Sequence, residues 1–118
     1  MILRGAATVN VLIVESDARQ TEIAMDLVRD VVRAQVDSTS SGERAIELAS
    51  RTPYQLIIAD CNPGDLDGLS LLERVKLLSP TTSVILTSSF ASIEEGVKAI
   101  RFGADEYFKK PFNPEHFK

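Results

Sequence analysis

The segment QLIIADCN (residues 55–62) places a short apolar run directly before an aspartate and an asparagine. Similar runs recur along the whole chain, and segments with a helical spacing of apolar residues separate them. Strands that are apolar on both faces and alternate with helices are typical of a parallel sheet covered by helices on each side. The expected strands are Val9–Val14, a weak one near Ala34–Asp37, Gln55–Ala59, Ser83–Leu86 and Glu106–Phe108.

The segments between the strands carry apolar residues three and four positions apart, which is the spacing of one helix face. Right-handed crossover connections between parallel strands then leave few possible topologies. The positions that share a face are Ile23, Leu27, Val28 and Val31 in the first helix, Leu71, Leu72, Val75 and Leu78 in the third, and Ile93, Val97 and Ile100 in the fourth.

Residues that begin and end helices agree with this division of the chain. Asp17 can cap the first helix, and Gly103 suits the left-handed residue that follows the fourth. Asn113 followed by Pro114 predicts the start of a fifth helix, which we expect to be truncated because the sequence stops at Lys118. The predicted capping boxes are Ser40 with Glu43 and Ser92 with Glu95.

Composition and charge narrow the class of protein. The 118 residues, 44% of them apolar and 25% charged, fit one globular domain and exclude a disordered chain. No apolar run approaches about 18 residues, so the sequence predicts no membrane span. A net charge of −4 argues against direct nucleic acid binding.

The sequence has one cysteine, Cys61, and one histidine, His116. It therefore predicts neither a disulfide within the chain nor a zinc site built from several such residues. With no export signal in Met1–Thr8, we expect a cytoplasmic location.

Polar residues follow four of the expected strands, at the point where each strand ends. They are Glu15-Ser16-Asp17, Asp60-Cys61-Asn62, Thr87-Ser88 and Lys110-Pro111. Because ligands of open parallel sheets bind at the carboxyl ends of the strands, we expect these groups to converge. An aspartate in this company can help to bind Mg²⁺, or it can act as a nucleophile toward phosphorus. In the second case a lysine and a hydroxyl would neutralise and hold the phosphoryl group.

This combination resembles the response-regulator receiver domain of bacterial two-component signalling, over about residues 10–117. The resemblance implies a single domain over residues 1–118, which we expect to be a fragment of a longer protein. It implies an α/β fold: a doubly wound, flavodoxin-like parallel sheet of five strands in the order 2-1-3-4-5, with helices on both faces. It also implies a cis peptide bond between Lys110 and Pro111, at a cost of only about 0.5–1 kcal/mol.

The resemblance assigns a role to each residue that matches the family motif. Asp60 matches the phosphoacceptor, and Thr87 and Lys110 match the groups that contact the phosphoryl group. Tyr107 matches an aromatic switch position, with a half-buried strand aromatic as the equal alternative; the switch pair would be Tyr107 and Thr87. The implied Mg²⁺ ligands are Glu15, Asp60, the backbone carbonyl of Asn62 and, at a weakened position, Ser16.

Two departures from the family pattern affect this interpretation. Ser16 stands where the family has a second acid that ligates Mg²⁺ directly, so we expect weak Mg²⁺ binding. Asp17 can compensate through water. Pro63-Gly64 shifts the usual loop proline by one position. Ser16 therefore keeps a second interpretation open, which is a pseudo-receiver interaction module with weak or no phosphorylation.

The function implied by the resemblance is a phosphorylation-controlled switch. The phosphoryl group would come from a sensor histidine kinase or a phosphotransfer protein, and the signal would pass to an output domain or a partner protein. A homodimer is compatible with the family, and we expect no membrane or direct nucleic acid contact. The sequence lacks a Gly-rich phosphate loop and a G-x-S-x-G elbow, so we expect no enzyme beyond self-phosphorylation and self-dephosphorylation.

Overall fold

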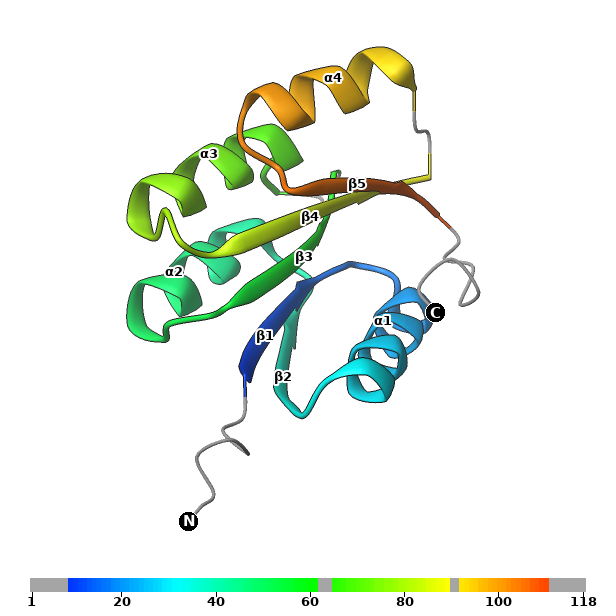
Figure 1. The fold of residues 1–118 in the computed structure, drawn as a ribbon, viewed down its shortest axis with the longest axis vertical. Helices are drawn as coiled ribbons and strands as arrows, with labels where there is room; N and C mark the ends of the chain where they lie inside the picture. Colours follow the sequence, from blue (N-terminus) through cyan, green and yellow to red (C-terminus); the bar gives the residue numbers. More distant parts are fainter. Residues whose placement is uncertain (1–8, 62–64, 90–91, 111–118) are drawn as a thin grey trace.

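The computed structural model describes residues 9–61, 65–89 and 92–110. Its strands form one parallel sheet in the order β2-β1-β3-β4-β5, which confirms the predicted fold class and strand order (Figure 1). The predicted fifth helix lies outside the described residues. The strands are β1 (Val9–Val14), β2 (Ala34–Thr39), β3 (Leu56–Asp60), β4 (Ser83–Ser88) and β5 (Glu106–Lys109).

The helices of the described residues divide between the two faces of the sheet. α1 covers one face, and α2, α3 and α4 cover the other (Figure 1). This division follows from right-handed crossovers, because the chain moves one way across the sheet from β1 to β2 and the opposite way from β2 to β5. No helix in this part of the chain has the length and apolar character to cross a bilayer. The helices are α1 (Ala18–Val31), α2 (Gly42–Arg51), α3 (Gly68–Leu78) and α4 (Ile93–Arg101).

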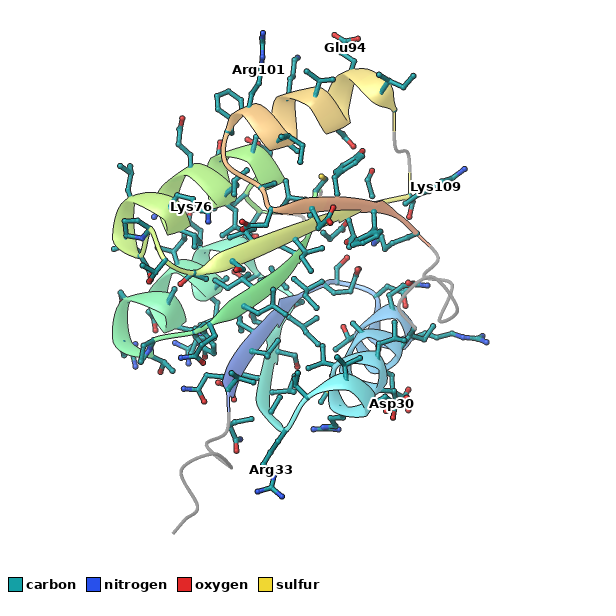
Figure 2. All side chains as sticks on the ribbon, in the orientation of Figure 1. Asp30, Arg33, Lys76, Glu94, Arg101 and Lys109 are labelled. Carbon is teal, nitrogen blue, oxygen red and sulfur yellow. The ribbon has the colours of Figure 1, made fainter. Side chains whose placement is uncertain are left out.

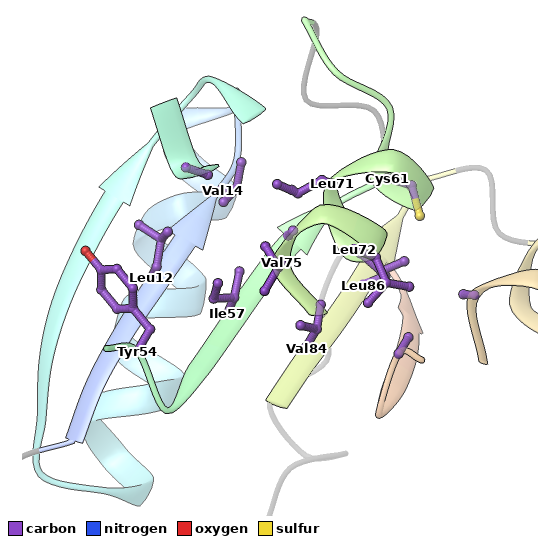
Figure 3. Close-up of a cluster of buried hydrophobic side chains, with 14 residues drawn as sticks. Leu12, Val14, Tyr54, Ile57, Cys61, Leu71, Leu72, Val75, Val84 and Leu86 are labelled. Atoms are coloured by element: carbon purple, nitrogen blue, oxygen red, sulfur yellow. The ribbon is translucent and has the colours of Figure 1, made fainter. Parts of the chain in front are cut away.

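The larger apolar core lies between the sheet and the three helices α2, α3 and α4 (Figure 3). α3 supplies Leu71, Leu72 and Val75, all of them almost fully buried. These three residues are on the face that the sequence spacing predicted. Of the four positions predicted for that face, only Leu78, at the end of the helix, is exposed. The strand residues of this core are Leu12, Val14, Ile57, Ala59, Val84 and Leu86.

The smaller core lies between the sheet and α1. Its buried members are Val11 and Ile13 of β1 with Ala24 and Val28 of α1. Ile23 and Leu27 are only half-buried, and Val31 is exposed, so the predicted face of α1 is partly covered. An apolar groove remains open beside this helix, lined by Ala24, Leu27, Val28, Val31, Val32, Leu56, Ile58 and Ile85.

The orientation of α4 differs from the sequence prediction. Ile93, Val97 and Ile100 are 87%, 50% and 53% exposed, whereas Ala99 is fully buried. The helix turns its small residues toward β5, and a Cβ added to Gly96 would lie 3.2 Å from the ring of Tyr107. Close approach of the helix to this ring thus determines which face is buried, and the apolar spacing is a poor guide here.

The helix caps confirm the predicted pattern with one correction. Asp17 caps α1 by accepting hydrogen bonds from the backbone N–H groups of Arg19 and Gln20. The prediction of Ser40 as the cap of α2 is wrong by one residue. Ser41 is the cap, because α2 begins at Gly42 and the Ser41 hydroxyl accepts from the N–H of Arg44.

The residues at the start and the end of α4 are those that the sequence predicted, Ser92 and Gly103. Ser92 caps α4 by accepting from the N–H of Glu95. The Glu95 carboxylate does not complete a capping box, because it accepts a hydrogen bond from Tyr107 instead. Gly103, with a φ of 106°, follows the helix in the left-handed region that favours glycine.

Candidate functional site

The register of the strands brings Glu15, Asp60 and Thr87 to one level at the carboxyl edge of the sheet. Val14 pairs with Ala59, so Glu15 follows at the level of Asp60, and Asp60 pairs directly with Thr87. Side chains at one level of a parallel sheet point to the same face. All three residues are buried. The structure therefore brings together two acids and a hydroxyl from three different strands.

Lys110 places its ammonium between the two carboxylates. Its Nζ lies 2.8 Å from Glu15 Oε1 and 3.1 Å from Asp60 Oδ1, and all three side chains are buried. The backbone N–H of Lys110 donates to the Ser88 carbonyl, which directs the residue back toward the sheet edge. Lys109 is exposed and points away from the site (Figure 2). The lysine at this site is therefore Lys110 and not its neighbour.

The charge state of Lys110 follows from its surroundings. Burial alone lowers the pKa of the ammonium, but hydrogen bonds and Coulombic attraction from Glu15 and Asp60 outweigh burial and raise the pKa above its usual value. Lys110 is therefore charged across the neutral range. Its charge offsets part of the repulsion between the two carboxylates.

The acids of the first loop are engaged in different ways. Glu15 uses both carboxylate oxygens, one with Lys110 and one with the N–H of Asp17. Asp17 Oδ1 caps α1, and Ser16 is exposed. Asp17 Oδ1 therefore accepts hydrogen bonds from α1. The buried carboxylates of the site are those of Glu15 and Asp60.

Oxygen ligands of this kind suit a hard cation such as Mg²⁺. Glu15 and Asp60 are the carboxylates that would hold it, with the Ser16 hydroxyl beside them. Among the described residues no group of three or more His, Cys, Asp or Glu side chains could hold a metal ion. The backbone carbonyl of Asn62, the third ligand position implied by the resemblance, lies outside the described residues. Glu15 and Asp60 are thus the two described carboxylates whose chemistry fits such a cation.

Thr87 and Ser88 end β4 beside the acids. Both are buried, and Thr87 Oγ1 lies 3.4 Å from the carbonyl oxygen of Ala59, which makes a long hydrogen bond. Rotation of the Thr87 hydroxyl would release this long bond and allow the O–H to donate to a ligand at Asp60. The threonine is thus at the position that the sequence predicted, one strand away from Asp60.

Two short backbone hydrogen bonds fix the chain after Asp60. The Cys61 N–H donates to Thr87 O at 2.7 Å, and the Gly68 N–H donates to Cys61 O at 2.7 Å. A Cβ on Gly68 would lie 2.6 Å from Cys61 Cα, so only glycine permits this approach. Burial raises the pKa of the Cys61 thiol to about 12, with the charge of Glu95 as the next contribution. The thiol is protonated and belongs to the larger apolar core.

Asp65 is a residue of this region that the sequence analysis missed. Its carboxylate accepts from the Ser41 hydroxyl and from the N–H groups of Gly42 and Glu43, at the start of α2. These bonds lower the pKa of Asp65 to about 2. They join the loop after Asp60 to α2. The available signal was an acid between the Pro63-Gly64 pair of the sequence and Asp67, but the partner of this acid is 24 residues away. Pro63-Gly64 and the bond between Lys110 and Pro111 lie outside the described residues.

Tyr107 lies on the α4 side of the sheet, opposite in face to Asp60. The ring is half-buried against the larger core, and its hydroxyl donates to the Glu95 carboxylate. Burial and then this hydrogen bond raise the pKa of Tyr107 to about 12. The sequence analysis named Tyr107 but assigned Glu95 only to a helix cap. The contact between them was not predictable from the spacing of either residue.

Comparisons with known proteins match this architecture. The family model of the response regulator receiver domain matches residues 11–118. The cell cycle response regulator CtrA of Brucella ovis is 31% identical over 105 residues, which cover 89% of this chain and 45% of the relative. The chain thus spans about half the length of the curated relatives that it matches.

Solved structures give the same result. The signal receiver domain of a Luxo repressor protein from Vibrio parahaemolyticus superposes with a TM-score of 0.85 at 27% identity, over 93% of this chain and 84% of that chain. A Burkholderia pseudomallei response regulator, solved with a phosphorylated aspartic acid and a calcium ion, gives a TM-score of 0.76 at 29% identity, over 92% and 63%. The family match, the strand order and these neighbours together show that the chain belongs to the response regulator receiver domain family.

Proposed function

We propose that this receiver domain accepts a phosphoryl group on Asp60 from the phosphohistidine of a sensor kinase or a phosphotransfer protein. The observation that carries the proposal is the buried ammonium of Lys110, 3.1 Å from Asp60 Oδ1. A receiver domain acts in two-component signalling, and this chain has the charge arrangement that phosphoryl transfer to a carboxylate requires.

In the proposed transfer, an Asp60 oxygen attacks phosphorus and forms an O–P bond while the P–N bond of the donor breaks. The electron pair of that bond leaves with the imidazole nitrogen. Lys110 neutralises charge on the transferring group, and the Thr87 hydroxyl donates to one of its oxygens. A bound Mg²⁺ would supply further charge neutralisation, with Glu15 and Asp60 as its carboxylate ligands. Hydrolysis of the acyl phosphate then returns Asp60 to its starting state.

The phosphorylated state would be transmitted through Tyr107 and Thr87 to an output domain or a partner protein. In this proposal the chain turns over no external substrate, and catalyses at most its own phosphorylation and dephosphorylation. A cytoplasmic location, the absence of direct nucleic acid binding by this domain, and a homodimer belong to the same proposal.

The test of the acceptor is intact-protein mass spectrometry after incubation with a small phosphodonor and Mg²⁺. We expect the native chain to gain the mass of one phosphoryl group and Asp60→Ala to gain none. Equal labelling of Asp60→Ala would move the acceptor elsewhere. No labelling of the native chain would favour the alternative function, an interaction module that has lost phosphorylation. The exposed Ser16 and the engagement of Asp17 in a helix cap favour this alternative.

Weak Mg²⁺ binding by the native chain is a further part of the proposal. Ser16→Asp restores a third carboxylate, so we expect its dissociation constant for Mg²⁺ to fall about tenfold or more, with labelling of Asp60 rising in parallel. Gln35→Glu is the matched control, because it adds the same charge at an exposed position of β2. Calorimetric titration of Mg²⁺ into the three proteins measures the difference. If the native chain binds as tightly as Ser16→Asp, this account of the site is wrong.

A further inference from the structure

Tyr107 is held at two points by the first turn of α4. Its hydroxyl donates to the carboxylate of Glu95, twelve residues earlier in the chain. Its ring lies directly against Gly96, because a Cβ at that position would come within 3.2 Å of Cδ2 and 3.4 Å of Cε2. No side chain separates the ring from the helix at this point. Contacts at the ring and at the hydroxyl together give Tyr107 one defined position.

Glu95 is itself held in place by the start of the helix. Its N–H donates to the Ser92 hydroxyl at 3.0 Å, which fixes the backbone of this residue at the N-terminus of α4. The side chain is half-buried and turned toward the sheet, where its charge contributes to the raised pKa of the Cys61 thiol. Glu95 therefore lies between α4, Tyr107 and the segment that follows Asp60.

The neighbouring acid shows that helix-end electrostatics do not explain this arrangement. Glu94 and Glu95 both belong to the first turn of α4, where a negative charge is favourable for any helix. Glu94 is exposed and points away from the body of the domain (Figure 2). Only Glu95 contacts Tyr107. The two residues thus share a dipole contribution and differ in the tyrosine contact.

We propose that Glu95 is a positioning residue, which holds Tyr107 against α4 and opposes movement of its ring when Asp60 becomes phosphorylated. The link to Asp60 rests on the proposed function, whereas the hold on Tyr107 rests on the contacts alone. The Glu95–Tyr107 hydrogen bond is made in the present ring position, so a ring that moved away from Glu95 would lose its stabilising contribution. Removal of the carboxylate should then favour the phosphorylated form.

The chain contains only two tyrosines, Tyr54 and Tyr107, which allows a direct test. Protein labelled with 3-fluorotyrosine gives two fluorine resonances in NMR spectra, and Tyr54→Phe identifies the one from Tyr107. We expect Glu95→Ala to shift and broaden the Tyr107 resonance and to leave that of Tyr54 unchanged. Glu94→Ala is the matched control, with the same loss of charge in the same turn, and should change neither resonance. An unchanged Tyr107 resonance in Glu95→Ala would contradict the proposal that Glu95 fixes the position of the Tyr107 ring.

The same variants test the link to Asp60. We expect Glu95→Ala to increase the equilibrium ratio of phosphorylated to free protein about fivefold or more at a fixed phosphodonor concentration, a usual size for coupled sites. Glu95→Gln, which keeps a neutral acceptor, should have a smaller effect. In a Tyr107→Phe background the Glu95→Ala effect should vanish.

The outcomes separate this inference from the proposed function. If Asp60 is labelled in all variants to the same extent, the link between Glu95 and phosphorylation is wrong. If no variant is labelled, the proposed function fails, while the fluorine resonances still decide whether Glu95 holds Tyr107. If Glu94→Ala changes the Tyr107 resonance as much as Glu95→Ala does, the proposal that Glu95 specifically fixes the Tyr107 ring is wrong.

Discussion

The two faces of the sheet are stabilised in different ways. The face under α2, α3 and α4 carries the larger apolar cluster, whose strand and helix residues are almost completely buried. The face under α1 carries a smaller cluster and an open apolar groove. The buried ion pairs join Lys110 to Glu15 and Asp60, which lie at one level at the carboxyl ends of β1 and β3, on the α1 face.

The two faces therefore contribute differently to the domain, one through apolar packing and the other through buried ion pairs. Apolar burial under three helices supplies most of the packing that keeps the strands in register. The α1 side holds buried charges, whose burial is costly without a partner, and the Lys110 ammonium pairs with both carboxylates. We therefore expect substitutions on the two sides to differ in the size of their effect and in its cause.

The largest effect is expected from Lys110→Met. Loss of the ammonium leaves two buried carboxylates close together without their partner, which costs about 3–5 kcal/mol of unfolding free energy. Lys109→Met is the matched control and should change the free energy by less than about 0.5 kcal/mol, because Lys109 is exposed. Urea unfolding of the three proteins measures both values. Similar losses in the two variants would contradict a site-specific role of Lys110.

A comparison of two leucines tests the apolar packing of the two faces directly. Leu72 of α3 is fully buried against the sheet, so Leu72→Ala should cost about 2–5 kcal/mol. Leu27 is only half-buried beside the groove on the α1 face, so Leu27→Ala should cost clearly less. The same urea experiment, with unchanged m-values, measures the difference. Equal costs would show that the groove is covered in solution.

A smaller and pH-dependent effect is expected from Asp65→Asn on the three-helix side. The folded-state pKa of Asp65 is about 2, below its ordinary value of 3.8, so the unfolded chain binds more protons between these values. The charged carboxylate therefore stabilises the fold fully above about pH 5, and this contribution is lost as the pH falls through about 2. The stability difference between native chain and Asp65→Asn should narrow from about pH 5 to about pH 3 in urea unfolding. A constant difference would contradict the charge-dependent cap.

The smallest effect is expected from Arg74→Ala. The pair between Arg74 and Glu43 joins α3 to α2 at 3.0 Å, but both side chains are about half exposed. Exposed pairs contribute about 0.2–1 kcal/mol, and the contribution falls as salt screens it. Thermal unfolding at low and high salt measures this loss. A larger, salt-independent loss would show that the arginine stem supports the packing of the two helices.

Most of the fold was predictable because four of the five strands combine an apolar run with a polar end. Two errors have a common physical cause, which is contact between residues far apart in the sequence. Ser41 caps α2 instead of Ser40 because Asp65, from another loop, binds the Ser41 hydroxyl. α4 exposes its most apolar side chains because Gly96 lies against Tyr107. The spacing of apolar and capping residues along the sequence does not predict either contact.

The candidate site was predictable to a similar extent. Asp60, Thr87 and Lys110 follow strand ends, and parallel strands bring such residues to one edge. The orientation of Asp17 was not predictable, since a helix cap and a water-mediated ligand require the same residue type at the same place. Glu95 was missed because its side chain could serve either the helix N-terminus or a partner on the next strand.

The ion pair between Glu15 and Lys110 also bears on the order in which the molecule forms. These residues are 95 positions apart, nearly the full length of the domain. Closure of so long a loop is entropically unfavourable until the intervening strands have paired, and contacts of this separation slow folding. During synthesis, Lys110 leaves the ribosome after all five strands, because β5 ends at Lys109. A nascent chain that ends before this residue has the described strands and helices but lacks both buried ion pairs, so the proposed acceptor site forms only after β5 has been made.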